Sequence, residues 1–395
     1  MKRSLILLSY LLSTFTSSVS AEVLPEIEIS GKGVTSANLE WLANSGETRL
    51  TPDYSDSTLM MGLRQKLYSD WRSYFAMGVQ LPDADSNLGD LFLSQTFLQL
   101  ENQNQRIKVG RSNAQTSLVT FPTLRDDDAL SFAYVLNPFS GGKNTQDHQY
   151  ANVLEYSYVY DQRWWGSVHT ENFVDFKNPN AFGINALGAT LAYEVPASQI
   201  WNREILQYAG LSFYNFLTER GEVAQEQSLQ PIDSSLRSLA AGLRLNVLPD
   251  PVHFIDLRGQ ATYNLGFSDV TGIEDYSDYT RANALATLWS LRYLHRRLER
   301  PLFQVSLSGG ARLYPNNPNQ SAEWIGLLNG FYRIGENLDL GLQYRYLNRQ
   351  GDVKSLLGGD EHRVQLALVY SFDMRFFDQF DDRNSLLNLE HSYLK

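Results

Sequence analysis

Alternating side-chain polarity, connections that alternate between short and long, and an export-type leader predict an all-β fold, a transmembrane antiparallel up-and-down β-barrel of about sixteen strands. The clearest alternating run spans residues 363–372, and another spans 253–267. Successive side chains of a strand point to opposite faces, so each run places its apolar residues on one face of a sheet. A membrane barrel needs this pattern because its outer face meets lipid and its inner face meets water.

Residues 1–21 have the layout of a secretory signal peptide. Lys2 and Arg3 form a basic start, an apolar stretch covers residues 5–12, and small residues precede a cleavage site after Ala21. The apolar stretch is too short to cross a bilayer as a helix. We therefore expect export, with a mature chain that begins at Glu22.

The composition of the chain excludes several classes of protein. It has no cysteine, which rules out disulfides, a thiol nucleophile and thiolate metal ligands. The net charge of −11 and the pI of about 5.1 argue against nucleic acid as a partner. The mean hydropathy is negative although 12% of residues are aromatic. A membrane barrel produces this combination because its lipid-facing and lumen-facing residues average out.

The expected barrel occupies residues 22–372, and its connections differ in length by parity. Two residues, Asp70 and Trp71, join the second run to the third, whereas 112–148 joins the fifth to the sixth. An up-and-down barrel has short turns at one end and longer loops at the other. Fourteen or eighteen strands remain alternatives. The expected strands are 27–41, 58–69, 72–81, 91–101, 104–111, 149–160, 163–176, 183–195, 203–217, 235–248, 252–268, 281–296, 300–313, 323–334, 336–348 and 360–372.

Charged side chains on the inner face predict a water-filled interior, because charges buried among packed side chains are costly. More of these side chains are basic than acidic, which favours anions over cations. Alternatively, each arginine is a wall residue held by a neighbouring carboxylate. The expected inward bases are Arg64, Lys66, Arg72, Arg244, Arg258, Arg292, Arg312, Arg345 and Arg363, and the expected inward acids are Glu155, Glu171, Asp256 and Asp339.

The 112–148 connection is too long for an ordinary surface loop without a role. It combines three consecutive acids, Asp126, Asp127 and Asp128, with an apolar stretch at 130–136. Folding inward would shelter the apolar residues and place the acids opposite wall arginines, which creates a transverse field across a narrowed pore. The alternative is an external loop that packs on a neighbouring subunit.

The third loop and the last strand resemble those of the Gram-negative general porins. A strand ending at residues 107–111 precedes the long acidic loop, and the last strand ends in Tyr370 and Phe372. The resemblance implies a homotrimer, constriction acids at Asp126, Asp127 and Asp128, facing bases at Arg64, Arg72 and Arg111, and an assembly signal at Tyr370 and Phe372 for the barrel-assembly machinery. Members of that family normally stop at the terminal aromatic residue, whereas this chain continues through 373–395. We expect this extension to be a periplasmic tail.

Together these features predict a bacterial outer-membrane porin that passes small hydrophilic solutes by passive diffusion and favours anions. Its expected partners are outer-membrane lipid, lipopolysaccharide, the assembly machinery and the solutes; no cofactor or metal is expected. No enzyme is expected either, because no HExxH pair is present and His169-Thr170-Glu171 lacks accompanying cysteines. The alternative is a non-conducting outer-membrane barrel that binds a periplasmic or envelope partner.

Overall fold

The computed structural model describes residues 25–42, 48–53, 57–67, 70–80, 92–113, 118–119, 121–124, 150–161, 163–172, 186–195, 204–217, 234–268, 285–297, 300–314, 322–351, 354 and 359–376. Within them no helix is long and apolar enough to cross a membrane. The signal peptide and the 377–395 part of the tail lie outside the described residues. The strands are β1 (Glu26–Leu42), β2 (Thr48–Asp53), β3 (Thr58–Lys66), β4 (Arg72–Gln80), β5 (Phe92–Glu101), β6 (Gln105–Asn113), β7 (Tyr150–Tyr160), β8 (Trp164–Asn172), β9 (Ala186–Glu194), β10 (Leu206–Leu217), β11 (Ser234–Pro249), β12 (His253–Ser268), β13 (Leu285–Arg297), β14 (Arg300–Leu313), β15 (Ala322–Arg333), β16 (Leu338–Gln350) and β17 (Glu361–Phe376).

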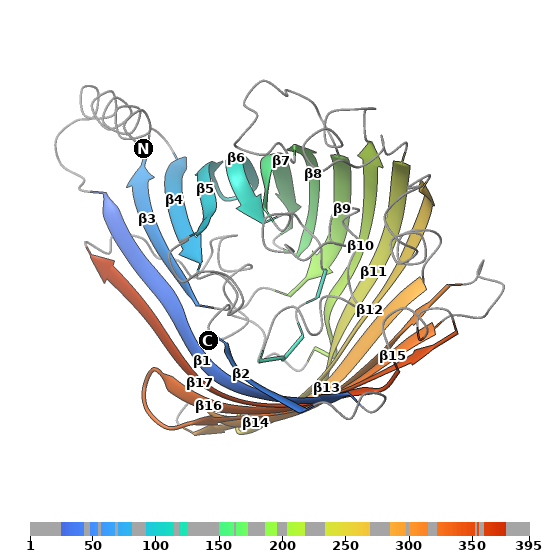
Figure 1. The fold of residues 1–395 in the computed structure, drawn as a ribbon. Coiled ribbons are helices and arrows are strands. Elements are labelled where there is room, and N and C mark those ends of the chain that lie inside the picture. Colours follow the sequence, from blue (N-terminus) through green and yellow to red (C-terminus); the bar gives the residue numbers. More distant parts are fainter. Residues whose placement is uncertain are drawn as a thin grey trace.

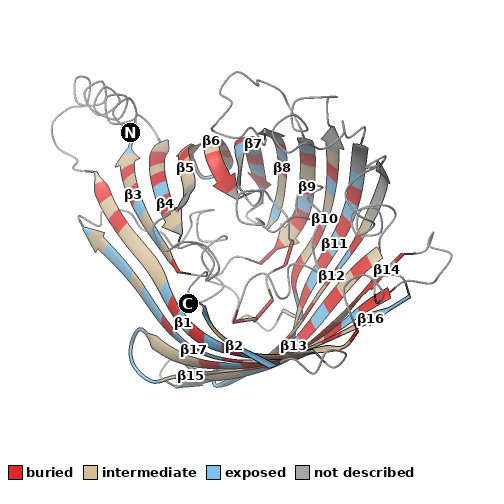
Figure 2. Cartoon of the chain, viewed as in Figure 1, coloured by how far each residue is buried: buried red, intermediate tan, exposed pale blue. Residues whose placement is uncertain are grey.

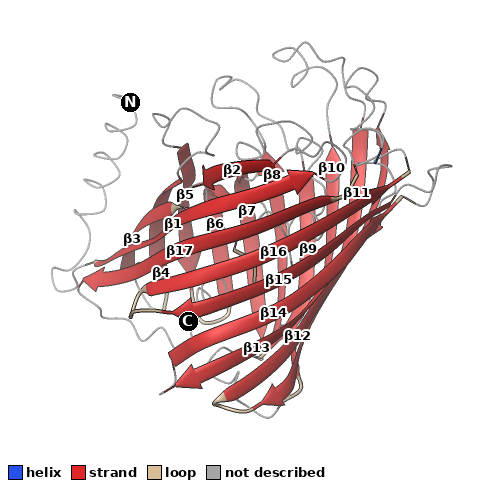
Figure 3. Cartoon of the chain, turned by 60° about the horizontal axis from the view of Figure 1, so that its bottom comes forward, coloured by secondary structure: helices blue, strands red, loops and turns tan. Residues whose placement is uncertain are grey.

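The strands form one closed antiparallel barrel (Figures 1 and 3). From β3 onward each strand pairs with the next in the chain, and β17 returns to pair with β1, where Gly31 lies opposite Phe372. Closure leaves no unpaired sheet edge, which is the condition for a sheet that faces hydrocarbon. The predicted fold class is therefore confirmed. The last strand ends at Phe376, four residues beyond its predicted end at Phe372.

Two strands, β2 and β3, lie end to end beside β1 and together occupy the place of one barrel strand, which we call the second barrel position. The sequence predicted a loop followed by one strand there. One half of β1 pairs with β3, with Ile27 opposite Leu63, and the other half pairs with β2, with Leu39 opposite Leu50. The barrel therefore has sixteen positions although it contains seventeen strands. The sequence does not predict β2 as a strand because it contains Pro52, and proline lacks the N–H group that pairs strands in a sheet.

Ser57 bridges the interruption between β2 and β3. Its hydroxyl accepts a hydrogen bond from the Val34 N–H at 2.8 Å and donates one to the Val34 carbonyl at 3.1 Å. Ser57 and Val34 are both buried. One side chain thus satisfies the backbone groups of β1 that the interrupted strand leaves without a ladder partner.

Replacing Ser57 with alanine is expected to destabilise the barrel by about 1–3 kcal/mol, because buried donors and acceptors lose their partner. The midpoint of urea unfolding in detergent micelles measures this change. Ser290→Ala is a suitable control, since the Ser290 hydroxyl is also buried but has no hydrogen-bond partner among the described residues. Equal midpoints for the two variants would contradict the bridging role of Ser57.

The lengths of the connections alternate between short and long along the chain, as predicted. At one end of the barrel the strands are joined by residues 67–71, 102–104, 161–163, 195–205, 250–252, 298–299 and 334–337. At the other end they are joined by 81–91, 114–149, 173–185, 218–233, 269–284, 314–321 and 351–360. Several connections at the short end are longer than the predicted ones, since 67–71 replaces 70–71 and 334–337 replaces 335, and the longest is 195–205. This asymmetry is typical of up-and-down membrane barrels.

The two faces of the sheet differ in burial and in polarity, so buried residues alternate with more exposed ones along much of the described barrel (Figure 2). In β13, Ser290 and Arg292 point inward and are buried, whereas Trp289 and Leu291 point outward and are 46% and 44% exposed. Outward aromatic rings also cover glycines on neighbouring strands. A Cβ atom built on Gly309 would lie 2.7 Å from the Trp289 ring, so a larger residue there would displace that ring.

Candidate functional site in the barrel interior

A segment of the β6–β7 connection lies inside the barrel, against the wall opposite β6. Its described residues are Leu118, Val119 and 121–124, which we call the lumen segment, and all of them except Thr123 are buried. The segment shares hydrophobic clusters with residues of β1, β9–β11, β13 and β15–β17. This part of the predicted inward loop is therefore inside the barrel. Asp126, Asp127 and Asp128 lie outside the described residues.

Glutamine side chains on the wall take the place of a neighbouring strand for this segment. Gln260 Oε1 on β12 accepts hydrogen bonds from the N–H groups of Leu118 at 2.8 Å and Val119 at 3.1 Å. Gln343 Oε1 on β16 accepts one from the Leu124 N–H at 2.9 Å. A segment inside a barrel needs such partners, because buried backbone groups without hydrogen bonds are costly.

Two wall glycines provide the space for the lumen segment. A Cβ atom built on Gly242 of β11 would lie 2.8 Å from both Leu118 Cβ and Val119 Cγ2. A Cβ atom built on Gly341 of β16 would lie 2.2 Å from Leu124 Cδ2. Both distances are shorter than van der Waals contact. The absence of a side chain at these positions therefore lets the segment approach the wall backbone closely.

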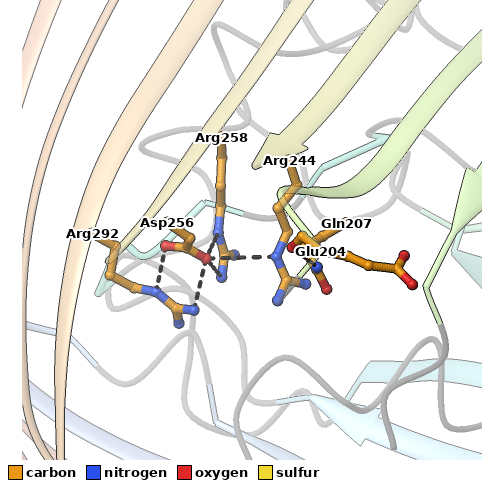
Figure 4. Close-up of polar contacts among 6 residues, drawn as sticks. All are labelled: Glu204, Gln207, Arg244, Asp256, Arg258 and Arg292. Carbon is orange, nitrogen blue, oxygen red and sulfur yellow. Dashed lines mark hydrogen bonds and ion pairs between the residues drawn. The ribbon is translucent and has the colours of Figure 1, made fainter. Parts of the chain in front are cut away.

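A charge cluster of the inner wall lies on β11, β12 and β13, where one carboxylate contacts three guanidinium groups (Figure 4). Asp256 is fully buried. Arg292 forms a bidentate pair with it, with Nε 3.0 Å from Oδ1 and Nη2 2.9 Å from Oδ2. Arg258 contacts Oδ2 through Nε at 3.0 Å and Nη2 at 2.9 Å, and the Nε of Arg244 lies 3.6 Å from the same oxygen. We call this group the Asp256 cluster.

Strand register brings the cluster together. Arg244 lies opposite Arg258, and Asp256 lies opposite Arg292, so residues from three adjacent strands share one patch of the inner face. The turn at 250–252 fixes the β11–β12 register. There the Asp250 carboxylate accepts hydrogen bonds from the backbone N–H groups of His253 at 2.7 Å and Val252 at 2.8 Å. These bonds hold the pKa of Asp250 below its ordinary value.

A second charged network lines the opposite end of the inner wall, on β14–β17. Glu323 pairs with Arg312 at 3.1 Å, and the Nε of Arg349 lies 3.7 Å from it. Glu361 pairs with Arg349 at 3.0 Å and also with Arg345. Each carboxylate thus joins two guanidinium groups, and the network belongs to the end of the barrel that has the long connections.

The predicted inward residues occupy different depths of the barrel. Arg72, Arg345 and Asp339 are half-buried, and Lys66 is exposed at the end of β3. The other described residues of this set are buried, namely Arg64, Arg111, Arg244, Arg258, Arg292, Arg312, Arg363, Glu155 and Asp256. The side chain of Glu171 lies outside the described residues. Tyr370 is exposed on the outer face, and Phe372 is half-buried against Gly31.

The three expected constriction bases are not at one level of the barrel. Arg64 and Arg72 lie close to the β3–β4 turn, at the end of the barrel that has the short connections. Arg111 lies near the C-terminal end of β6, toward the end that has the long connections. Gly110, with a φ of +128°, precedes Arg111. This left-handed backbone interrupts the alternation of β6, so Lys108 and Arg111, three residues apart, are both buried.

Sequence reasoning missed most of the inward acids. Arg64 pairs with Glu26 at 3.7 Å and Glu28 at 3.3 Å, and Arg363 lies 3.7 Å from Glu40. Alternation along a strand assigns a face to a residue but not a cross-strand partner. Several wall arginines are therefore held by carboxylates, which was the alternative considered for them. The Asp256 cluster differs because its three described guanidinium groups share one carboxylate.

Comparisons with known proteins identify the fold. Neither a family model nor a curated protein matches the sequence. Among solved structures, OmpF of Salmonella typhi in complex with daunomycin matches at a TM-score of 0.61 and 13% identity, over 88% of this chain and 97% of that chain. An anion-selective porin of Comamonas acidovorans matches at 0.58 and 13%, over 88% and 100%. The outer-membrane channel DcaP of Acinetobacter baumannii matches at 0.58 and 14%, over 90% and 100%. The chain therefore has a porin-type barrel fold.

Proposed function

We propose that this protein is an outer-membrane porin through which small hydrophilic solutes diffuse passively. The observation that carries the proposal is the distribution of side chains on a closed barrel. Charged residues such as Arg258 and Arg292 point inward, and apolar residues such as Leu291 and Leu307 point outward. An outward apolar band suits lipid, and an inward set of charges suits a path for water and solutes.

The sequence supports further parts of this proposal. Residues 1–21 act as a cleaved signal peptide, the protein resides in the bacterial outer membrane, and Tyr370 and Phe372 serve as the assembly signal. Its surroundings are lipid and lipopolysaccharide, and its oligomeric state is a homotrimer. The protein has no catalytic role. The chain beyond Phe376 is a periplasmic tail, which follows from placing the short connections on the periplasmic side.

The proposed selectivity favours anions. The Asp256 cluster places three positive charges and one negative charge on one patch of the inner wall. The loop that contains the lumen segment narrows the pore, and Asp126, Asp127 and Asp128 face wall arginines from it. Replacing these three acids with asparagine should raise the anion preference if the loop lines the pore.

Planar-bilayer recording of the purified protein tests the function. We expect discrete conductance steps in KCl. Under a KCl gradient we expect a reversal potential closer to the equilibrium potential of chloride than to that of potassium. Persistent silence, also after deletion of 377–395, would contradict the channel. That outcome would favour the alternative, a non-conducting barrel that binds a periplasmic or envelope partner and is filled by packing such as that of the lumen segment.

A further inference from the structure

We propose that the outer face of β8–β12 binds lipopolysaccharide, with its acyl chains in an apolar groove and a phosphate of its lipid A part on Arg237. This site goes beyond the proposed passage of solutes. It rests on the proposed outer-membrane location with the long connections at the external surface, and it does not depend on whether the barrel conducts.

The groove has a volume of about 820 Å³ and lies on the outer face of strands that are neighbours in the wall (Figure 1). Small outward residues leave it hollow, namely Gly166 on β8, Ala241 on β11 and Ala261 on β12. The larger side chains beside them, Leu211, Phe213 and Leu239, are exposed. Because an apolar hollow offers water no hydrogen-bond partner, hydrocarbon chains fill it when the barrel is in a membrane.

The width of the groove favours a lipid that has several acyl chains. Neighbouring strands of a sheet lie about 4.8 Å apart, so the strands β8–β12 extend the groove over roughly 20 Å. Ala241 and Ala261 lie opposite each other, so the hollow crosses from one strand to the next. A single hydrocarbon chain would fill only part of this space, whereas lipid A carries several chains on one headgroup.

Arg237 places a positive charge at one end of the groove. It is exposed and shares the outer face of β11 with Leu239, two residues further along the strand. The outward residues of β11 from Leu239 to Val247 are all apolar. Arg237 therefore lies where the apolar band ends, on the side of the long connections, and it has no hydrogen-bond or ion-pair partner among the described residues.

Polar residues of neighbouring strands lie in the same row as Arg237. Asn215 of β10 lies opposite Arg237, and the row continues through Leu187 of β9 to Thr170 of β8. A lipid whose chains lie in the groove thus presents its headgroup to Arg237. A guanidinium group binds phosphate oxygens through paired, charge-assisted hydrogen bonds, so a phosphorylated headgroup is favoured over a neutral one. The long connections place this headgroup in the external leaflet.

Native mass spectrometry of the purified protein in detergent, titrated with diphosphoryl lipid A, tests the site. We expect saturable binding to the wild type. Arg237→Gln should weaken this binding about tenfold, because a hydrogen bond to a charged group is lost. Ala241→Phe should weaken it by about tenfold as well, because a ring in the groove displaces several CH₂ groups of the lipid. The second variant tests the site even if the first fails to fold.

Two matched variants change the surface away from the groove. Arg297→Gln removes an exposed arginine at the opposite end of the barrel, on β13, and Ala37→Phe adds a ring at an exposed outward position of β1. Both should bind lipid A as the wild type does. Phosphatidylglycerol, the other source of a lipid phosphate, should bind more weakly than lipid A because its two chains fill less of the groove.

The outcomes distinguish this site from other roles of the same surface. Wild-type affinity in both Arg237→Gln and Ala241→Phe overturns the site, and equal binding of phosphatidylglycerol and lipid A overturns the assignment to lipopolysaccharide. A smaller oligomeric mass for Ala241→Phe than for the wild type would assign the groove to a contact between copies of this chain and also overturns the site. A barrel that binds lipid A but stays silent in a planar bilayer contradicts the proposed channel and supports this site.

Discussion

Replacing Gly242 and Gly341 together with valine is expected to change a steady channel current into one that fluctuates between levels. New side chains at these positions would overlap Leu118, Val119 and Leu124, which are packed against the wall. Overpacking of this kind costs about 1–3 kcal/mol per site, enough to displace a segment held by a few hydrogen bonds. A displaced segment would move in the pore, and single-channel recordings would show it as excess current noise.

Gly326→Val is the matched control for the double variant. Gly326 lies on β15 of the same wall but on its outer face, which it shares with Trp324 and Leu328, and a Cβ atom built on it meets nothing within 4 Å, so valine there adds the same bulk away from the lumen segment. Its current should resemble that of the wild type. Gln343→Leu provides an independent approach, because it removes the acceptor of the Leu124 N–H group without adding bulk to the wall backbone. Steady currents in both the valine and the leucine variants would show that the lumen segment does not border the conducting path.

Replacing Asp256 with asparagine is expected to cost the barrel about 3–5 kcal/mol of unfolding free energy, the usual effect of leaving buried charges without their partner. Three guanidinium groups would then face one another with a neutral side chain between them. The midpoint of urea unfolding in detergent micelles measures the loss. Added salt should restore part of the stability, since anions from solution can screen the repulsion between the guanidinium groups.

Asp339→Asn is the control for this measurement. Asp339 pairs with Arg333 at 2.9 Å, but the two side chains are 24% and 26% exposed, so its loss should cost less than about 1 kcal/mol. A second variant that combines Asp256→Asn with Arg292→Met should recover stability relative to Asp256→Asn alone, because it removes one unpaired charge. Equal midpoints for Asp256→Asn and the wild type would show that the cluster is solvated well enough to need no internal carboxylate.

The sixteen positions of the barrel and the order of its strands could be predicted because alternation and connection parity are local properties of the sequence. The paired strands around the 250–252 turn, for example, need only their own apolar residues and a short turn to be recognised. The interruption of the second barrel position could not be predicted in this way. The segment that contains Pro52 forms a strand only because β1 extends beyond β3 and offers it a partner.

The arrangement of the interior depends on contacts between residues far apart in the chain. The sequence shows that Arg258 and Asp256 share a face, but strand register decides that Arg244 and Arg292 join them. It also places Glu26 beside Arg64, because β1 pairs with β3 as well as with β2. The need for glycine at positions 242 and 341 is explained only by the contacts of Leu118 and Leu124 with these two sites. Alternation therefore predicts faces, and the closed barrel determines partners.

The central claim is that one face of this sheet meets water and the other meets lipid, and thiol labelling in vesicles tests it directly. The chain has no cysteine, so a single introduced thiol is the only reactive one. Leu342 and Arg345 lie on opposite faces of β16; Arg345 points inward and is half-buried, and Leu342 points outward and is 54% exposed. In lipid vesicles, a small charged thiol reagent should modify the Arg345→Cys variant and leave the Leu342→Cys variant unmodified, since a thiol surrounded by hydrocarbon forms no thiolate. Faster modification of Leu342→Cys than of Arg345→Cys would contradict this arrangement of the two faces.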